Sequence, residues 1–396
     1  MHDIWTRRAI LAGGLTSLAI SGTSLATTLS SKRFQLKETA GLRRFGFPIH
    51  VIVPGLDPAS SPFRLRRDGK DVPAQFRAAR HRSGKDQLTL DFNASLGPEE
   101  TETYEIVPAS ESFESGRSPM IERDGTNLTV NSGLVWNFQE SVDGVLRGAR
   151  GGKTPYLAGD SLVLAAGTVE GREAKVISEG PLSVIRQGPL AVGLRQQLKI
   201  IINDKDAVDS TIDLTLPSSK SWIEVEWLVN DPQRRLRSLR WTASLAIGDG
   251  PTLVDLGAQS TMYMTLKPQE RIIMMMTQDI KVKAYRPLWT IEKKRPDGVV
   301  ETLAIGHDPA EGWAHVMDRT RATAIGFDKF SPLVHESQTI DIQGDGKVVF
   351  ESVSRESAGP NQRLHSWFHF VPMPVQVGAL TSPQSMMNPP QVHWLA

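Results

Sequence analysis

Residues 222–227, WIEVEW, alternate between the two faces of an extended chain, and LRWTASL at residues 239–245 follows the same rule. The same period of two occurs in LTLDF at 88–92 and in IDLTL at 212–216. Alternation with β-branched and aromatic residues is typical of half-buried antiparallel strands. Turn-forming pairs with glycine separate the runs, at 68–69, 124–125, 143–144, 249–250, 297–298 and 344–346. The sequence therefore predicts an all-β fold.

The strand runs fall into two groups. Residues 42–107 predict a small N-terminal β-barrel or sandwich, and 108–127, rich in Ser, Glu, Gly and Pro, predict a linker. Residues 128–375 predict a large antiparallel β-sandwich, a supersandwich of the galactose-mutarotase-like kind. A Pro/Met-rich tail follows at 376–396. Residues 312–323 are the predicted short helix, with a pair of strands as the alternative.

Residues 1–26 have the features of a targeting segment. Arg7 and Arg8 precede a weakly apolar run, 9–26, which ends in the small residues of Ser24-Leu25-Ala26. A paired arginine before such a run predicts a twin-arginine signal peptide, and so a periplasmic or secreted protein. An uncleaved membrane anchor is the alternative, but a run this rich in Gly and Ser is a poor span. We therefore expect no stable membrane span after processing.

The composition limits the function classes. The 396 residues include 45 Lys+Arg and 44 Asp+Glu, a formal net charge of +1, and no basic run is interleaved with aromatic residues as nucleic-acid binding requires. The cysteine count is zero, which excludes disulfides, thiol nucleophiles and Cys-ligated metals. We predict neither a metal nor a cofactor.

The first candidate site is RLHSWFH at residues 363–369. In a strand, His365, Trp367 and His369 point to one face. An indole covers the apolar face of a sugar ring, while imidazoles bind hydroxyl groups or transfer protons. The alternative is a strand at the edge of the core whose histidines only have structural partners.

The second candidate site is the segment 307–319, which mixes acidic, basic and aromatic side chains. Within it we select Trp313 as a sugar platform, His315 as a base and Arg319 as a cation. The alternative is a polar turn that leads into a strand. The basic residues in 234–240 could neutralise an acidic sugar, or simply decorate a turn.

Glu224 and Glu226 share one strand face, about 7 Å apart. This separation falls in the range of inverting glycosidases, about 6.5–9.5 Å. The alternative is a solvated acidic face.

Part of the chain resembles a known family. RFGFPI at 44–49, LRRDGKDVPAQ at 65–75, LTLDF at 88–92 and ETETY at 100–104 resemble, in this order, the N-terminal barrel of the exo-rhamnogalacturonan lyase (YetA-like) family. LTVNSGL at 128–134, EGPL at 179–182 and QGP at 187–189 are similar to its central β-sandwich. The resemblance covers roughly residues 42–370 and implies a polysaccharide lyase. The helical domain of those lyases has no counterpart here, and no family catalytic residue matches a position in this chain.

Two functions follow from these observations. The first is an exported carbohydrate-active protein, a polysaccharide lyase-like enzyme (or a glycoside hydrolase) acting on an acidic polysaccharide, with His365 or His315 as base and Arg319 as cation. The second is a carbohydrate-binding or cell-envelope assembly protein without catalysis. Both predict a polysaccharide or oligosaccharide ligand and no nucleic acid. They differ in what they require of the structure. The enzyme requires that the two histidine-containing segments meet in one cleft, whereas the binding protein does not.

Overall fold

The structure is a computed structural model. It describes residues 31–57, 62–80, 86–114, 119–140, 145–204, 206–248, 250–258, 261–278, 286–330, 336–356, 359–373 and 383–395. The predicted signal peptide, 1–26, lies outside the described residues, as do parts of the predicted linker and of the predicted tail. The predicted all-β fold, with a small N-terminal β unit followed by a large antiparallel sandwich, is confirmed.

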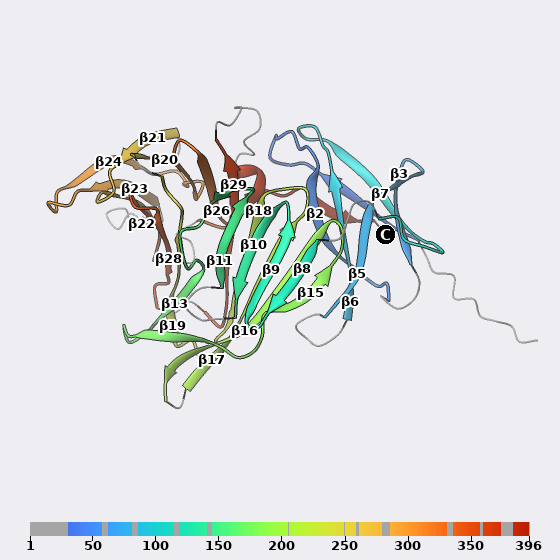
Figure 1. The fold of residues 1–396 in the computed structure, drawn as a ribbon, viewed down its shortest axis with the longest axis horizontal. Helices are drawn as coiled ribbons and strands as arrows, with labels where there is room; N and C mark the ends of the chain where they lie inside the picture. The colour runs from blue at the N-terminus through green and yellow to red at the C-terminus, as the bar shows by residue number, and fades with distance from the viewer. Residues whose placement is uncertain are drawn as a thin grey trace, which may run out of the picture. The chain divides into compact units, whose positions relative to one another are not determined.

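The N-terminal unit contains two sheets (Figure 1). One has the strand order β30-β1-β7-β3-β4 and the other the order β2-β6-β5. The strands are β1 (Lys32–Lys37), β2 (Phe47–Val53), β3 (Phe63–Arg67), β4 (Lys70–Val72), β5 (Ala74–Arg80), β6 (Asp86–Ala94), β7 (Thr101–Pro108) and β30 (Gln391–Trp394). Aromatic side chains fill the space between the sheets: Phe34 stacks on Tyr104 at 5.3 Å between ring centroids, and Phe92 lies 4.9 Å from Tyr104. The C-terminal strand β30 therefore lies at the edge of this sheet, paired with β1, the first described strand.

A further sheet packs on the sandwich. Its order is β12-β11-β10-β9-β8, and its strands are β8 (Met120–Asp124), β9 (Asn127–Ser132), β10 (Leu134–Gln139), β11 (Leu146–Gly151) and β12 (Thr154–Pro155). Trp136 and Tyr156 contact the ring of Phe370 in the sandwich. The domain boundaries drawn from the sequence stay predictions.

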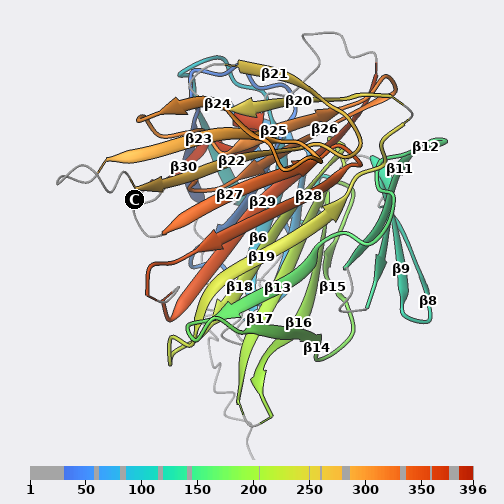
Figure 2. The ribbon, with the colours of Figure 1, turned by 90° about the vertical axis from the view of Figure 1, so that its left-hand side faces the viewer.

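The sandwich consists of two antiparallel layers joined through β14 (Figure 2). The layer that faces the N-terminal unit, here the cleft layer, pairs its strands in the order β15-β16-β17-β18-β29-β26-β25-β20-β21. The other, here the outer layer, has the order β13-β19-β28-β27-β22-β23-β24. The strands are β13 (Val163–Thr168), β14 (Glu173–Ser178), β15 (Ser183–Gln187), β16 (Ala191–Asn203), β17 (Asp206–Pro217), β18 (Trp222–Asn230), β19 (Leu236–Ser244), β20 (Thr252–Gly257), β21 (Thr261–Leu266), β22 (Arg271–Gln278), β23 (Pro287–Lys294), β24 (Val300–Gly306), β25 (Trp313–Met317), β26 (Arg321–Phe327), β27 (Ser337–Gln343), β28 (Lys347–Val353) and β29 (Asn361–Pro372).

The central strands of the cleft layer are buried on both faces. Phe368 of β29 packs between the layers against Trp241, at 4.9 Å between ring centroids. Trp222 and Trp367, on the opposite face, belong to the core of the N-terminal unit together with Met386. The N-terminal unit therefore covers the face of the cleft layer that the alternating pattern leaves polar.

The short helix predicted at 312–323 is wrong, and the strand pair is right. β25 and β26 pair in antiparallel fashion across a turn at 318–320. Asp318 Oδ1 accepts hydrogen bonds from the backbone N–H groups of Thr320 and Arg321. A carboxylate that satisfies these groups favours a turn over a continued helix.

The tail forms two elements. The helix α1 (Pro383–Met387) packs on β26, β25 and β29, and β30 joins the N-terminal unit. No helix among the described residues is long and apolar enough to cross a membrane.

Candidate functional site

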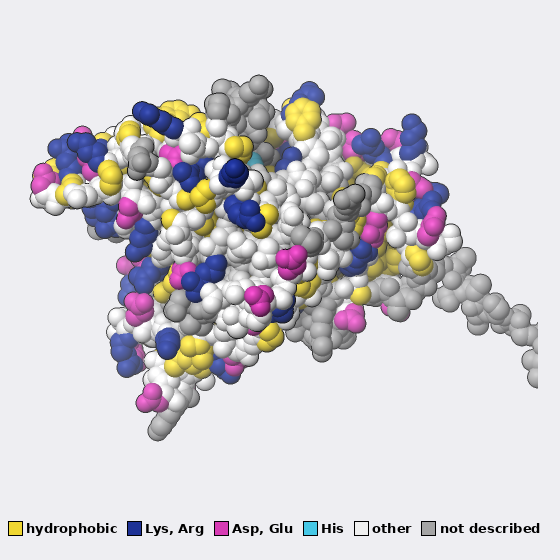
Figure 3. All heavy atoms as spheres, in the orientation of Figure 1, with side chains coloured by type: hydrophobic (Ala, Val, Ile, Leu, Met, Phe, Trp, Pro, Cys, Tyr) yellow, Lys and Arg dark blue, Asp and Glu magenta, His cyan; other side chains and the backbone are white. Residues whose placement is uncertain are grey.

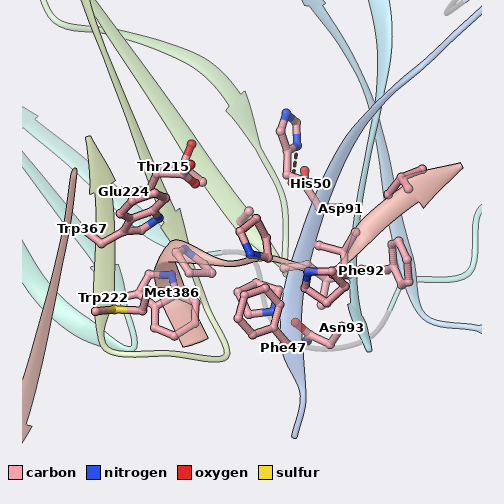
Figure 4. Close-up of a pocket in the computed structure, with 18 residues that line it drawn as sticks. Phe47, His50, Asp91, Phe92, Asn93, Thr215, Trp222, Glu224, Trp367 and Met386 are labelled. Carbon is pink, nitrogen blue, oxygen red and sulfur yellow. Dashed lines mark hydrogen bonds and ion pairs between the residues drawn. The ribbon is translucent and has the colours of Figure 1, made fainter. Parts of the chain in front are cut away.

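A cleft lies between the sheet β2-β6-β5 and the cleft layer. It contains two adjoining cavities, of about 200 and about 380 Å³. His50 of β2, Thr215 of β17 and Glu224 of β18 line both cavities. Figure 4 shows Glu224 and Thr215 on one side of the smaller cavity and His50 and Asp91 on the other. The cleft therefore brings together polar groups from two parts of the chain.

The first polar group is centred on Glu224 and His365. His365 Nε2 lies 2.6 Å from Glu224 Oε1, and Arg363 Nη2 lies 3.0 Å from His365 Nδ1. Asp328 Oδ2 is 3.7 Å from the same Nδ1. In the pairing of β18 with β29, Glu226 is opposite His365 and Glu224 is opposite Trp367, so His365 reaches Glu224 diagonally.

These neighbours shift both pKa values. Burial opposes the charge on His365, but the hydrogen bonds and negative charges of Asp328 and Glu224 outweigh it, and the pKa of His365 is raised. Burial likewise opposes the charge on Glu224, but its hydrogen bond to His365 and the positive charges of His365 and Arg186 leave its pKa lowered. The pair is therefore most strongly charged at mildly acidic pH, as an imidazolium beside a carboxylate. In that state His365 Nδ1 carries a proton directed toward Asp328, and its contact with Arg363 is no longer a hydrogen bond.

The second polar group joins the N-terminal unit to β15. His50 Nδ1 lies 2.8 Å from Asp91 Oδ1, and Arg186 Nη1 lies 2.9 Å from His50 Nε2. Gln75 Nε2 donates to Asp91 Oδ2 at 3.1 Å, and Arg186 Nη2 donates to Thr215 at 3.3 Å. Asp91 is 3% exposed; burial raises its pKa, but the positive charge of Arg186 and the hydrogen bond from His50 more than compensate, and the pKa of Asp91 is lowered.

This geometry fixes the tautomer of His50. A guanidinium group has no acceptor, so His50 Nε2 accepts the hydrogen bond from Arg186 and His50 Nδ1 donates to Asp91. Both ring nitrogens are then engaged. Glu224 Oε2 is different, because no other part of the described chain donates a hydrogen bond to it. Glu224 is about one third exposed. Glu224 therefore keeps one carboxylate oxygen that can accept a proton from a molecule in the cleft.

The apolar wall of the smaller cavity is aromatic. Trp367, Trp222, Phe47 and Met386 line it, and the Trp367 ring lies 4.0 Å from the His365 ring between centroids. Trp367 is only 5% exposed and packs in the core of the N-terminal unit. The indole lines the cavity but is at the same time a core residue, so it is not an open platform.

The structure brings the two histidine-containing segments onto one face of the cleft layer. His369 of β29 and His315 of β25 are both opposite Ala324 of β26, one from each side. His315 Nδ1 lies 3.4 Å from Asp255 Oδ2. His369 is 5% exposed, packs against the Trp222 ring at 5.6 Å, and has its pKa lowered to about 4 by burial and by the charges of Lys220 and His315. Neither His315 nor His369 lines the two cavities.

The other two predicted residues lie elsewhere. Trp313 is buried on β25, where its Nε1 donates to Glu311 at 2.5 Å. Arg319 is exposed in the turn between β25 and β26. His365 lies toward the opposite end of these strands, beside Asp328. The structure therefore does not bring Arg319 to His365. The guanidinium groups of Arg186, Arg195 and Arg363 line the larger cavity with Glu224 instead, and the charge of Arg186 acts on Glu224.

The acidic pair and the basic run have structural partners. Glu226 pairs with Arg363, whereas Glu224 pairs with His365. Arg235, Arg237 and Arg240 pair with the carboxylates of Asp231, Glu336 and Glu173, respectively. Figure 3 shows basic and acidic side chains interspersed over the face it displays. The basic run therefore adds no cations to the cleft.

His50, Asp91 and Arg186 were missed by the sequence reasoning. The signal for Asp91 was present: it lies between Leu90 and Phe92 in a strand whose five central residues are all buried. A buried carboxylate needs a partner, and His50 is its register partner on β2. Nothing local in the sequence indicates Arg186. No cluster of three or more His, Asp or Glu side chains within the described ranges is arranged to hold a metal ion.

The comparisons with known proteins concern the fold. No family model matches the sequence, and no curated protein matches it. Two solved structures from Enterococcus faecalis are similar: an alpha-mannosidase from strain V583 and a protein in Glycosyl Hydrolase Family 38. Each has a TM-score of 0.50 and 9% sequence identity over 92% of this chain, and this chain spans 46% and 47% of their lengths, respectively. A putative aldose 1-epimerase from Escherichia coli K12 is a third, with a TM-score of 0.32 and 12% identity over 65% of this chain and all of that one. The first two likenesses show the β-sandwich fold, and the resemblance to exo-rhamnogalacturonan lyases stays a prediction.

Proposed function

We propose that this chain is an exported carbohydrate-active protein that binds its sugar in the cleft and transfers a proton through Glu224. The observation that carries the proposal is the pair of polar groups on opposite walls of one cleft, with Glu224 lining both of its cavities. One further fact supports it: the fold is shared with an alpha-mannosidase. Arg7 and Arg8 support export.

The finer proposal is β-elimination on an acidic polysaccharide. Glu224 removes the proton on the carbon beside a uronate carboxylate, and the electron pair of that C–H bond forms a carbon–carbon double bond. The bond to the leaving sugar oxygen breaks, and that oxygen keeps the bonding electrons and takes a proton from water. Arg186 stabilises the negative charge that develops on the uronate. His365 positions Glu224 and, with its raised pKa, balances the carboxylate charge before the proton arrives.

A sugar-binding protein without catalysis is the second candidate. It is favoured by the engagement of both His50 ring nitrogens with Asp91 and Arg186, which leaves that imidazole no free site for a proton. In this case the cleft binds a sugar and releases it without a chemical change.

One experiment separates these functions. The mature protein is incubated with polygalacturonate, rhamnogalacturonan and neutral galactan, and the ultraviolet absorbance of unsaturated products, the reducing ends and the binding isotherm are measured. A lyase produces both absorbance and reducing ends, a hydrolase produces reducing ends alone, and a binding protein gives only an isotherm.

Variants then test the assignment of Glu224. Glu224→Gln keeps the shape of the side chain but removes the base, and we expect at least about a hundredfold loss of rate, the usual contribution of a general base. Glu173→Gln, which breaks an ion pair on the outer layer, is the matched control and retains full activity. Equal activity of Glu224→Gln and the wild type would contradict the role of Glu224.

A further inference from the structure

The C-terminal segment returns to the cleft after the sandwich is complete. Met386 of α1, the prolines 389 and 390, and Val392 of β30 line the smaller cavity. They face it together with Trp222 and Trp367, which belong to the cleft layer. The last described residues therefore form part of the wall of the site.

A buried arginine holds this segment. Arg44 Nη1 donates to the carbonyl oxygen of Ser385 at 2.6 Å and to its hydroxyl at 2.9 Å, and Arg44 Nη2 donates to the carbonyl oxygen of Asn388 at 2.6 Å. The guanidinium is fully buried and pairs with Glu38, which is also fully buried, at 2.8 Å. Glu38 in turn accepts hydrogen bonds from the backbone N–H groups of Ala40 and Leu42. The N-terminal unit thus fixes the backbone on both sides of Met386 and Met387.

The segment also divides the face of the cleft layer. Glu224, Trp367, Gly326 and Trp313 follow one another across adjacent strands in one row. Met387 lies on Gly326, in the middle of the row: a Cβ atom at position 326 would come within 2.7 Å of Met387 Cγ. In the next row, Ala324 packs in the same core cluster as Met386, and His369 and His315 are on either side of it.

We propose that the segment Pro383–Trp394 is a specificity-determining wall, positioned by Arg44, that ends the cleft at Trp367 and separates it from Trp313, His315 and His369. The claim that a sugar contacts this wall rests on the proposed function, but the closure of the face does not. The wall explains why the sequence correctly places two histidine-containing segments on one face although neither His315 nor His369 lines the cleft.

The test uses diethylpyrocarbonate, which modifies accessible, neutral imidazoles, with the labelled residues identified by mass spectrometry. His369 is neutral at pH 7, so access alone limits its labelling. In the wild type we expect slow labelling of His369 and His315 and fast labelling of His393, which is exposed on β30. Met387→Ala removes the side chain on Gly326 and should accelerate labelling of His369 and His315 about tenfold, the factor for a loss of about 1.4 kcal/mol of protection.

Arg44 is tested with its partner. Arg44→Met alone leaves Glu38 buried and unpaired, so it is combined with Glu38→Gln, and the double variant should show the same acceleration. Arg44→Lys retains a charge for Glu38 and donors for the backbone, and should restore slow labelling. If the Arg44 variants do not fold, Met387→Ala decides alone. Unchanged labelling of His369 and His315 in folded Met387→Ala overturns the proposal, whatever the polysaccharide screen shows, because no sugar is present.

Discussion

His365 makes the stability of the protein depend on pH in a direction that the structure fixes. Replacing it with Gln removes the imidazolium between Glu224 and Asp328 while keeping an amide that can still form a neutral hydrogen bond. Hydrogen bonds to charged groups contribute about 1.5–3 kcal/mol each. Because Glu224 is about one third exposed, solvent screening places this pair at the lower end, about 1.5 kcal/mol.

The sign of the effect follows from the two pKa shifts. The pKa of His365 is raised in the folded state, so its contribution is fully present below its unfolded pKa of about 6.5 and is lost as pH rises through the folded pKa. The pKa of Glu224 is lowered, so its contribution is present above its unfolded pKa of about 4.3 and is lost as pH falls through the folded pKa. Both contributions are complete only between about pH 4.3 and pH 6.5.

Thermal unfolding followed by circular dichroism measures this window. In a chain of this size about 1.5 kcal/mol lowers Tm by about 2 °C, so His365→Gln should have a Tm about 2 °C below the wild type near pH 5.5. The difference should shrink at alkaline pH. His393→Gln is the matched control, since His393 is exposed and its loss should not change Tm at any pH. A Tm difference that does not vary with pH would refute the ion pair.

Three further outcomes test other parts of the structure. Trp367→Ala should lower the free energy of unfolding by about 3 kcal/mol in denaturant titrations, as buried Trp-to-Ala changes do, and Trp367→Phe by less; unchanged stability of the Ala variant would mean that the indole is exposed. Arg186→Gln leaves Asp91 buried with one charge partner fewer and should cost about 3 kcal/mol, part of which Arg186→Gln combined with Asp91→Asn recovers; strictly additive costs would argue against their contact. Changing both Arg7 and Arg8 to Lys should leave unprocessed precursor in the cytoplasm in fractionation experiments, and undiminished export would contradict the twin-arginine assignment.

The alternating pattern was sufficient to predict the all-β fold and the part of the candidate site that lies on β29. A period of two assigns each side chain of a strand to a face, and it placed His365, Trp367 and His369 together correctly. It could not show what covers that face, because burial of the second face depends on residues far away in the chain. The alternating pattern therefore predicts Trp367 to be an exposed residue that could stack on a sugar, although the residues around it bury it in the core.

The remaining half of the site depends on strand register, which is a long-range property. His50 and Asp91 are opposite each other in the pairing of β2 with β6, and Glu224 and Trp367 are opposite each other in the pairing of β18 with β29. A slip of one residue in either pair would turn the polar side chains away from the cleft.

The apolar residues on the other face prevent such a slip. In the β18–β29 pair, Ile223 and Phe368 are register partners whose side chains are buried between the two layers, so a slip would move both side chains out of the core. The same alternation that identifies the strands thus holds Glu224 in the cleft, although it carries no signal that His50 and Asp91 lie across from it. We infer that substitutions which weaken the sandwich core beneath β18 and β29 also weaken the site, through register and not through direct contact.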